Sequence, residues 1–424
     1  MSSARRNILL LIPCYGFGGA QQVFHDHSVE LGTRFNVTEA VFNMDLPDVY
    51  PSGNPVVDLQ VAGAPGVVGK LRQFWRRCQR LRALKRDKAI DLSISHLEGA
   101  DYVNLLSRVG ERSIAVIHGS KAHDGNIAGW LGWLRHRVLL PLCYRLPDHI
   151  VTVSRELRQE LIDFYGVDAK RISVINNFFY PDRILTRANQ SIEARYEPLF
   201  RSSRVMVTSG RLTIQKNQLS LVAVFAALLA RRPGSKLAVL GDGELRNDLV
   251  AQAQGLGLRV YQTWNNDPLD VDYDLYFLGY QNNPFPYIRR SGLFVFPSGW
   301  EGFPMALCEA MLCGVPVVST DCPTGPREIL APATPATQQA KATEWAEFGV
   351  LMPLLADPNR EQAQDEWVST LAALLDDAPR LAHYAGQGPL RMQAFTPEKM
   401  LQKWLTLIED LGLNSTDASG RGST

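Results

Sequence analysis

The stretch FVFPSGWEGFPMALCEAMLCGVP, residues 294–316, carries the strongest structural signal in the chain. It opens with an apolar run typical of a buried strand, passes a short loop that holds Glu301, and continues from Pro304 into a helix that carries Glu309. A second apolar run follows Gly314. Strand, helix and strand in this order predict a parallel sheet covered by helices. The first amides of such a helix have no acceptor within it, so this loop is suited to an anion such as a diphosphate.

Apolar runs and amphipathic stretches alternate in the same way on both sides of this segment. The expected strands cover residues 8–12, 37–42, 91–95, 113–117, 149–153, 171–176, 204–209, 236–240, 276–278, 293–297 and 315–319. The expected helices cover residues 18–31, 70–86, 134–142, 218–230, 244–253 and 304–313. The predicted fold class is α/β, with two doubly wound Rossmann-like domains built on parallel sheets.

The predicted domain boundaries lie where this alternation lapses. The first domain takes residues 1–185, a polar and charged linker takes residues 186–203, and the second domain takes residues 204–390. A C-terminal helix over residues 391–413 is expected to return toward the first domain, and residues 414–424 are expected to be a disordered tail. Open parallel sheets bind ligands at the carboxyl ends of their strands, which favours a cleft between the two domains as the site.

Composition narrows the class of protein. The 424 residues contain 44 lysines and arginines against 43 aspartates and glutamates, and a net charge of +1 predicts no nucleic-acid partner. None of the six cysteines falls in a C-x-x-C pair, which fits a reducing cytosol and argues against a disulfide framework or a zinc site. The apolar run at residues 8–12 is too short for a signal peptide, and no run reaches the roughly 18 residues needed to cross a bilayer. These observations predict a cytoplasmic protein.

Three other loops follow expected strands and combine glycine with charge. In SGRLTIQKN, residues 209–217, Arg211 and Lys216 could clamp a diphosphate as a bidentate fork and a point charge. LGDGE, residues 240–244, ends the next strand in a turn, and YGFGGAQQ, residues 15–22, follows the first strand with glycines that let backbone approach a ligand. Taken singly, each loop could also be a solvated surface turn.

Taken together and in this order, these motifs resemble the family 4 retaining glycosyltransferases of GT-B fold. The resemblance rests on the two glutamates of residues 294–316, on GRLTIQKN and GDGE, and on GGAQ after the first strand, and it extends over residues 5–410. DCPTGPREI, residues 321–329, resembles a subset of the family that acts on lipid-linked or cell-surface glycans. The resemblance implies transfer of a hexosyl or N-acetylhexosaminyl group, with a uridine diphosphate sugar as the expected donor. It further implies a glycan or lipid-linked saccharide acceptor, as in bacterial surface polysaccharide or lipopolysaccharide synthesis.

The resemblance also implies a role for each site residue. Arg211 and Lys216 would hold the donor diphosphate, Glu309 would bind the ribose hydroxyls, and Glu301 would meet the donor sugar. The backbone at Phe303, Pro304 and Met305 and the loop at Gly18 and Gly19 would also contact the diphosphate. The base would lie in the region of Gly241, Gly243, Leu278 and Gly279. His118 would lie against the sugar. His118 and Glu301 are the expected catalytic residues. The expected mechanism retains the anomeric configuration, with the leaving phosphate accepting the proton, and uses no metal and no cofactor.

The stretch 70–86 is rich in lysine and arginine, contains no acid, and places Phe74, Trp75, Cys78, Leu81 and Leu84 near one helical face. Such a helix could lie on anionic lipid, which would place the protein on the inner face of the cytoplasmic membrane. It could equally pack on the sheet and leave a solvated basic face. Trp130, Trp133, Arg135 and Arg137 could add to the lipid surface.

Two other classes of protein stay open as alternatives. A dinucleotide-dependent oxidoreductase is suggested by Gly16 and Gly18 after a strand, although Gln21 stands where the fingerprint has glycine or alanine. A non-catalytic GT-B-like partner subunit would share the fold without the chemistry. A metal site at Asp270, Asp272 and Asp274 is not favoured, because these residues lie in a polar loop before a strand.

Overall fold

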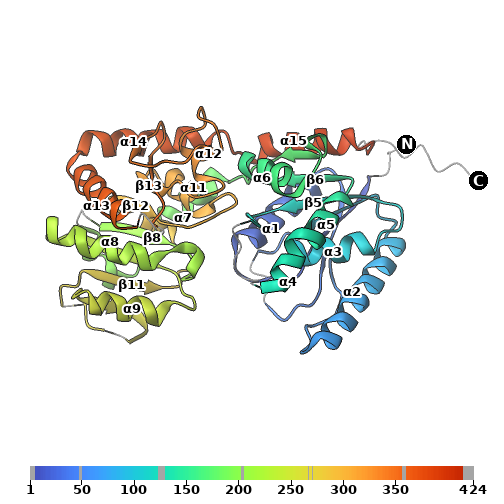
Figure 1. Cartoon of the computed structure of the whole chain (residues 1–424), viewed down its shortest axis with the longest axis horizontal. Coiled ribbons are helices and arrows are strands. Elements are labelled where there is room, and N and C mark those ends of the chain that lie inside the picture. The colour runs from blue at the N-terminus through green and yellow to red at the C-terminus, as the bar shows by residue number, and fades with distance from the viewer. Residues whose placement is uncertain are drawn as a thin grey trace, which may run out of the picture. The chain divides into compact units, whose positions relative to one another are not determined.

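The computed structural model describes residues 5–46, 50–122, 129–201, 205–265, 267–269, 271–355 and 360–413. The chain divides into two compact units. The first contains Met1–Phe178 and Pro397–Thr424, and the second contains Phe179–Thr396 (Figure 1). Each unit has a parallel sheet with helices, as the alternation of strands and helices in the sequence predicts.

The first unit has a seven-stranded sheet in the order β3-β2-β1-β4-β5-β6-β7, and every pair of neighbours is parallel. The strands are β1 (Asn7–Ile12), β2 (Asn36–Val41), β3 (Val56–Asp58), β4 (Leu92–His96), β5 (Arg112–Ile117), β6 (His149–Thr152) and β7 (Ile172–Val174). The helices are α1 (Gly19–Gly32), α2 (Val67–Asp87), α3 (Glu98–Leu106), α4 (Gly129–Leu134), α5 (Leu140–Arg145), α6 (Arg155–Tyr165) and α15 (Pro397–Asp410). The strand order reverses beside β1, which makes the β1–α1 loop the place where a doubly wound sheet binds ligands.

The second unit has an eight-stranded sheet in the order β10-β11-β9-β8-β12-β13-β15-β14, in which only the edge pair β14–β15 is antiparallel. The strands are β8 (Val205–Ser209), β9 (Lys236–Leu240), β10 (Val260–Gln262), β11 (Leu275–Gly279), β12 (Leu293–Phe296), β13 (Val317–Thr320), β14 (Glu344–Trp345) and β15 (Val350–Met352). The helices are α7 (Pro181–Ala188), α8 (Gln218–Arg231), α9 (Arg246–Gly255), α10 (Phe285–Arg289), α11 (Met305–Leu312), α12 (Pro326–Leu330), α13 (Arg360–Asp376) and α14 (Ala378–Met392).

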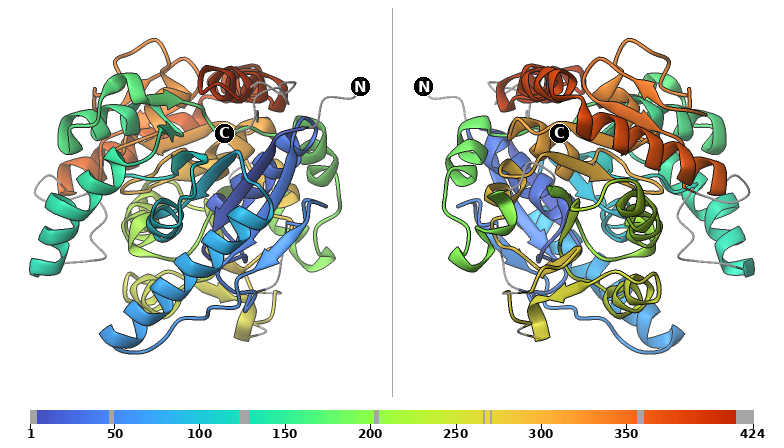
Figure 2. Two further views of the ribbon diagram at one scale, coloured as in Figure 1. Left: turned by 90° about the vertical axis from the view of Figure 1, so that its right-hand side faces the viewer. Right: turned by 90° about the vertical axis from the view of Figure 1, so that its left-hand side faces the viewer.

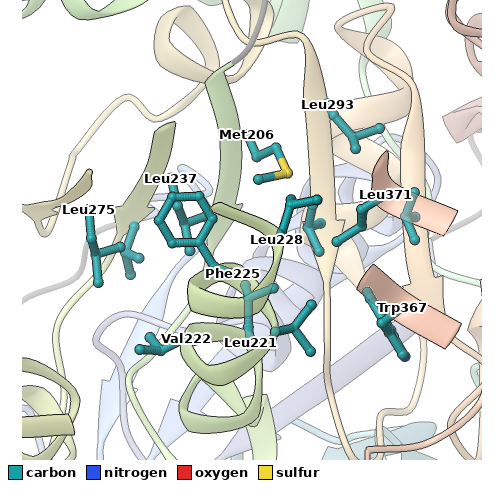
Figure 3. Packing of buried hydrophobic residues seen from close by; sticks show 14 of the residues in the cluster. Met206, Leu221, Val222, Phe225, Leu228, Leu237, Leu275, Leu293, Trp367 and Leu371 are labelled. Carbon is teal, nitrogen blue, oxygen red and sulfur yellow. The ribbon is translucent and has the colours of Figure 1, made fainter. Parts of the chain in front are cut away.

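The core of the second unit packs against β8 and β9, the strands that precede the loops at residues 209–217 and 240–244. Phe225 and Leu228 of α8 pack against Met206 of β8 and Leu237 of β9, and Trp367 of α13 closes the same cluster (Figure 3). All five side chains are at most 1% exposed. Burial of such side chains stabilises the fold by about 1.5–3 kcal/mol each, and this packing fixes the positions of the strands.

The unit boundaries differ from the predicted domain boundaries. Residues 186–201, predicted as part of a linker, belong to the second unit and form the end of α7 and two short 3-10 turns. The reason is that Tyr196 and Phe200 are buried and both contact the ring of Tyr287. The predicted helix at 391–413 is two helices, because α14 continues to Met392 and α15 starts at Pro397 in the first unit. The tail at residues 414–424 lies outside the described residues.

Helix α2 packs on the sheet of the first unit through most of the apolar face that could alternatively have bound lipid. Cys78 and Leu81 are buried in a cluster with β1 and β2 residues, and Phe74 and Leu84 pack against it. Arg77, Arg80 and Arg82 donate hydrogen bonds to backbone carbonyls of Val61, Leu59 and Leu106, so they hold the helix to neighbouring segments. The alternative of a helix packed on the sheet is therefore correct for Phe74, Cys78, Leu81 and Leu84, whereas Trp75 is exposed. The first turns of α2 extend past the sheet (Figure 2).

Candidate active site

Two glycine loops at the carboxyl ends of β8 and β9 interlock through their backbones. The Leu212 amide donates to the Asp242 carbonyl at 3.0 Å, and the Leu245 amide donates to the Leu212 carbonyl at 3.0 Å. A Cβ at Gly241 would lie 2.0 Å from the Gly210 oxygen, and one at Gly243 would lie 2.5 Å from the Leu212 oxygen. Side chains at these positions would force the loops apart, so glycine is required there.

This interlocking positions the basic residues of the β8 loop. Lys216 ends a short 3-10 turn, and its Nζ lies 2.6 Å from Oε1 of Glu301 and 5.2 Å from the centre of the Phe296 ring. Glu301 is 6% exposed. Arg211 is exposed, and within the described ranges its guanidinium forms no ion pair. The structure therefore brings Lys216 and Glu301 together and leaves Arg211 at the surface of the same loop.

The β12 loop that carries Glu301 is held from two sides. The Gly299 amide donates to the Gln215 carbonyl at 2.8 Å, and Nε2 of Gln215 donates to the Trp300 carbonyl at 2.8 Å. On the other side, the Glu301 amide donates to the Pro323 carbonyl at 3.0 Å, and the Thr324 hydroxyl donates to the Glu301 carbonyl. These bonds fix Glu301 before any ligand arrives, which is the preorganisation that a charged site needs.

Helix α11 starts one residue later than predicted, because Pro304 has extended backbone angles and occupies the N-cap position. The Phe303 ring is buried and packs on Phe395 at 5.1 Å, so only the backbone of Phe303 can meet a ligand. Glu309 lies one turn into α11. Burial raises the pKa of Glu309, the positive charge of Arg187 in α7 partly offsets this effect, and the resulting pKa is about 7. This carboxyl group therefore titrates near neutral pH.

The predicted base-binding residues lie next to the interlocked loops. The Gly241 amide donates to the Gly279 carbonyl at 2.8 Å, and Gly279 has a φ of +69°. The Leu278 side chain is buried, and its carbonyl accepts from Nε2 of Gln281 at 2.7 Å. Leu278 can therefore contact a base only through its backbone.

The first unit carries the other predicted residues. Gly18 is the N-cap residue of α1 and Gly19 is its first residue, so both lie at the β1–α1 loop where the strand order reverses. His118 directly follows β5, and its Nε2 lies 2.9 Å from Nδ1 of His96 at the end of β4. The two rings are stacked, with centroids 5.0 Å apart.

The sequence-based prediction of these sites omits three residues that the structure places in them. His96 and Arg187 were missed, although SISH at residues 93–96 shows a histidine at a strand end as clearly as residues 117–118 do. Thr324, which holds the Glu301 carbonyl, has a φ of +66° and no distinctive sequence signal.

Two other segments that stand out in the sequence form ion pairs within the second unit. Asp272 and Asp274 pair with Lys236 and Arg259, while Asp270 lies outside the described residues. In the segment 321–329, the buried guanidinium of Arg327 pairs with Asp321 at 2.5 Å and with Glu344 at 2.7 Å.

The fold and the candidate site together indicate the class of protein. Two α/β units on parallel sheets, one with glycine loops and a preset Lys–Glu pair at its strand ends, are typical of proteins that bind nucleotides in doubly wound domains. Residues 17–183 match the sequence family Glycosyltransferase Family 4, and residues 191–347 match Glycosyl transferases group 1. The chain belongs to the family 4 glycosyltransferases of GT-B fold.

Individual relatives agree with this assignment. The chain is 30% identical over 275 residues to an uncharacterized glycosyltransferase of Methanocaldococcus jannaschii, covering 63% of this chain and 64% of that protein. It is 24% identical over 413 residues to the N-acetylgalactosamine-N,N'-diacetylbacillosaminyl-diphospho-undecaprenol 4-alpha-N-acetylgalactosaminyltransferase of Campylobacter jejuni, covering 94% of this chain and 98% of that enzyme. Among solved structures, Anabaena HepE in complex with UDP and glucose superposes with a TM-score of 0.69 at 18% identity, covering 96% of this chain and all of HepE. In the part of the chain that the structure describes, no helix combines the length and apolarity needed to cross a bilayer.

Proposed function

We propose that this protein transfers a hexosyl or N-acetylhexosaminyl group from a uridine diphosphate sugar to a lipid-linked saccharide, with retention at the anomeric carbon. The observation that carries the proposal is the preset pair of Lys216 and Glu301 beside the start of α11. An anion-binding helix end and a lysine suit a diphosphate. The names of the Campylobacter jejuni relative, and of HepE solved with UDP and glucose, support the acceptor and the donor class.

In this proposal the second unit binds the donor. Lys216 and Arg211 hold the diphosphate together with the backbone at Phe303, Pro304 and Met305. Glu309 accepts hydrogen bonds from the ribose hydroxyls, and the base lies along the backbone of Gly241, Gly243, Leu278 and Gly279. Glu301 accepts hydrogen bonds from hydroxyls of the sugar. Its negative charge beside a diphosphate would be unfavourable alone, and the Lys216 ammonium at 2.6 Å offsets that repulsion.

The first unit would contribute Gly18 and Gly19 beneath the donor and His118 against the sugar. Transfer breaks the bond between the anomeric carbon and the diphosphate oxygen and forms one between that carbon and an acceptor hydroxyl oxygen. The hydroxyl proton passes to the departing phosphate on the same face of the sugar. Negative charge grows on the diphosphate as its bond breaks, so Lys216 and Arg211 bind the transition state more tightly than the donor.

We also propose that the protein lies on the membrane surface that holds its acceptor. The exposed first turns of α2 carry an apolar stripe of Val67, Val68, Leu71 and Trp75, flanked by exposed Lys70, Arg72 and Arg76. Trp133, which is 63% exposed, adds a second apolar side chain from α4. Aromatic and aliphatic groups bordered by cations suit an interface with anionic lipid.

A binding and transfer experiment tests the proposed function. The thermal shift of the purified protein is measured with uridine, guanosine and adenosine diphosphates and with NAD and NADP, and transfer from UDP-sugars to an undecaprenyl-diphosphate-linked saccharide is followed by mass spectrometry. We expect UDP to stabilise the protein, by about 2.7 kcal/mol at a hundredfold excess over its Kd. We expect a product with the anomeric configuration of the donor.

Matched variants make this test specific. Lys216→Met should abolish the UDP shift and the transfer, and Glu309→Gln should reduce both strongly. Lys341→Met, at an exposed position of the same unit, should change neither. A shift with NAD or NADP alone would instead favour an oxidoreductase. Binding of a glycan or a partner enzyme that persists in Lys216→Met without any transfer by the wild type would favour a non-catalytic subunit.

A further inference from the structure

Two histidine side chains, one at the end of β4 and one directly after β5, contact each other through their ring nitrogens. Nδ1 of His96 and Nε2 of His118 are 2.9 Å apart, a hydrogen-bonding distance. His96 is completely buried, while His118 is partly exposed. His96 therefore cannot reach a ligand itself and can act only through His118.

Both rings are neutral at physiological pH. Burial, together with the positive charge of the Lys121 ammonium, lowers the pKa of His118 to about 3. Burial also lowers the pKa of His96 well below its ordinary value, with His118 and His27 adding to the effect. A neutral imidazole has one N–H and one bare nitrogen, so one ring of the pair donates and the other accepts.

The surroundings of His96 decide which ring donates. Its other nitrogen, Nε2, is buried and has no hydrogen-bond partner in the described chain. If His118 donated from Nε2, neutral His96 would have to carry its proton on Nε2, which would bury an N–H group without an acceptor. If His96 donates from Nδ1, only a bare acceptor is left unpaired. Among buried backbone groups, an N–H without an acceptor is rarer than an acceptor without a donor, and the same preference favours the bare Nε2 of His96.

We propose that His96 is a positioning residue, which donates from Nδ1 to Nε2 of His118 and so holds the proton of His118 on Nδ1. His118 then presents an N–H donor, and not a lone pair, to an oxygen atom of the bound ligand. The ligand chemistry that this favours is a hydroxyl or ring oxygen of the transferred sugar. The identity of that ligand rests on the proposed function, whereas the tautomer does not.

The neighbouring rings keep His96 in place without sharing its hydrogen bond. The Phe24 ring packs edge-on against the His96 ring with centroids 5.2 Å apart, and the centroid of the His27 ring lies 5.3 Å from that of His96. His27 in turn contacts Trp404 of α15 at 5.0 Å, and neither of its nitrogens has a partner among the described residues. His27 is thus a matched control, since it is a buried histidine in contact with His96 that makes no hydrogen bond to the pair.

The experiment is a nitrogen-15 NMR measurement of histidine tautomers in the full-length protein, with peaks assigned by substitution. We expect His118 to be protonated on Nδ1 in the wild type and to shift toward the Nε2–H form in His96→Leu. His96→Asn, whose amide can donate from the place of Nδ1, should restore the wild-type tautomer, and His27→Phe should leave it unchanged. An Nε2-protonated His118 in the wild type, or a tautomer that does not respond to His96→Leu, would overturn the proposal.

Kinetics give a second readout. In His96→Leu we expect kcat to fall about tenfold, the worth of one hydrogen bond, with the Kd for UDP unchanged within about twofold, because UDP lacks the sugar. His96→Asn should recover most of kcat. Equal losses in kcat and UDP affinity would show a merely structural role. If the wild type catalyses no transfer, the proposed function fails, and the tautomer measurement still decides the role of His96.

Discussion

Nζ of Lys216 lies 2.6 Å from Oε1 of Glu301, although the two residues stand 85 positions apart and on loops that follow different strands. The pair brings opposite charges to the start of α11 before any ligand is bound. A donor diphosphate would therefore meet an ammonium group whose position is already set. The pair also makes Glu301 dependent on Lys216, because Glu301 is nearly buried.

This dependence predicts the energetics of the pair. Lys216→Met should lower the free energy of unfolding by about 1–3 kcal/mol, because it leaves the Glu301 carboxylate buried without its partner. The double variant Lys216→Met with Glu301→Gln should recover most of this loss while still failing to bind UDP. Urea denaturation of the four proteins of the cycle measures the coupling. Additive effects of the two substitutions would contradict an interaction between these side chains.

Glu309 predicts opposite effects on stability and binding. The folded protein releases the Glu309 proton near pH 7, whereas the unfolded chain releases it near the ordinary pKa of 4.5. The wild type should therefore lose stability as the pH rises from about 4.5 to 7, on the order of 3 kcal/mol in all. Glu309→Gln removes this loss, so its advantage over the wild type in urea denaturation should be small at about pH 5 and greatest at about pH 8.

The same titration should govern nucleotide affinity. A ribose hydroxyl donates to a carboxylate better than to a carboxylic acid, so UDP affinity should rise between about pH 6 and 8. Glu309→Gln should bind UDP weakly, with little dependence of its Kd on pH over this range. Calorimetric titration of both proteins checks this. A wild-type Kd that is flat over the range would show that Glu309 does not contact the ribose.

Gly241 predicts a glycine-specific requirement. Its φ is +137°, and a Cβ at this position would lie 2.0 Å from the Gly210 oxygen, so Gly241→Ala should separate the β8 and β9 loops. We expect Gly241→Ala to lower the free energy of unfolding by about 2–4 kcal/mol and to abolish the thermal shift with UDP. Gly255→Ala is the control, because a Cβ there meets nothing within 4 Å and its backbone is helical. It should be neutral or slightly stabilising.

The limits of sequence reasoning here have physical causes. The strands and the loops at 209–217 and 294–316 could be predicted, because alternating hydrophobicity and the glycine and charge at strand ends are local signals. The pairing of His96 with His118 could not, since it depends on β4 and β5 lying side by side. The start of the second unit was predicted too late in the chain, because Tyr196 and Phe200 are buried inside a stretch that is polar on average. The basic residues of α2 looked solvated, but Arg77, Arg80 and Arg82 bond to carbonyls that only the folded chain places nearby.

The ion network around Arg327 predicts a stability defect away from the site residues. Arg327 is fully buried between Asp321 and Glu344, and the Ala340 amide also donates to Asp321 at 2.6 Å. Arg327→Met should cost about 3–5 kcal/mol, because it leaves the Asp321 carboxyl group buried without its cation. Arg380→Met, which breaks an exposed pair with Asp377, should cost less than about 1 kcal/mol. Equal costs in urea denaturation would show that burial does not govern these pairs.

The first turns of α2 predict membrane binding that depends on three basic side chains. Lys70→Glu, Arg72→Glu and Arg76→Glu together should abolish co-sedimentation with anionic vesicles, since each basic residue contributes about 1 kcal/mol near such a surface. Trp75→Ala should weaken binding without changing the charge. The matched control reverses Arg34, Lys88 and Lys170, which are exposed in the same unit. An equal loss in both charge-reversed proteins would show that net charge, and not the exposed end of α2, brings the protein to the membrane.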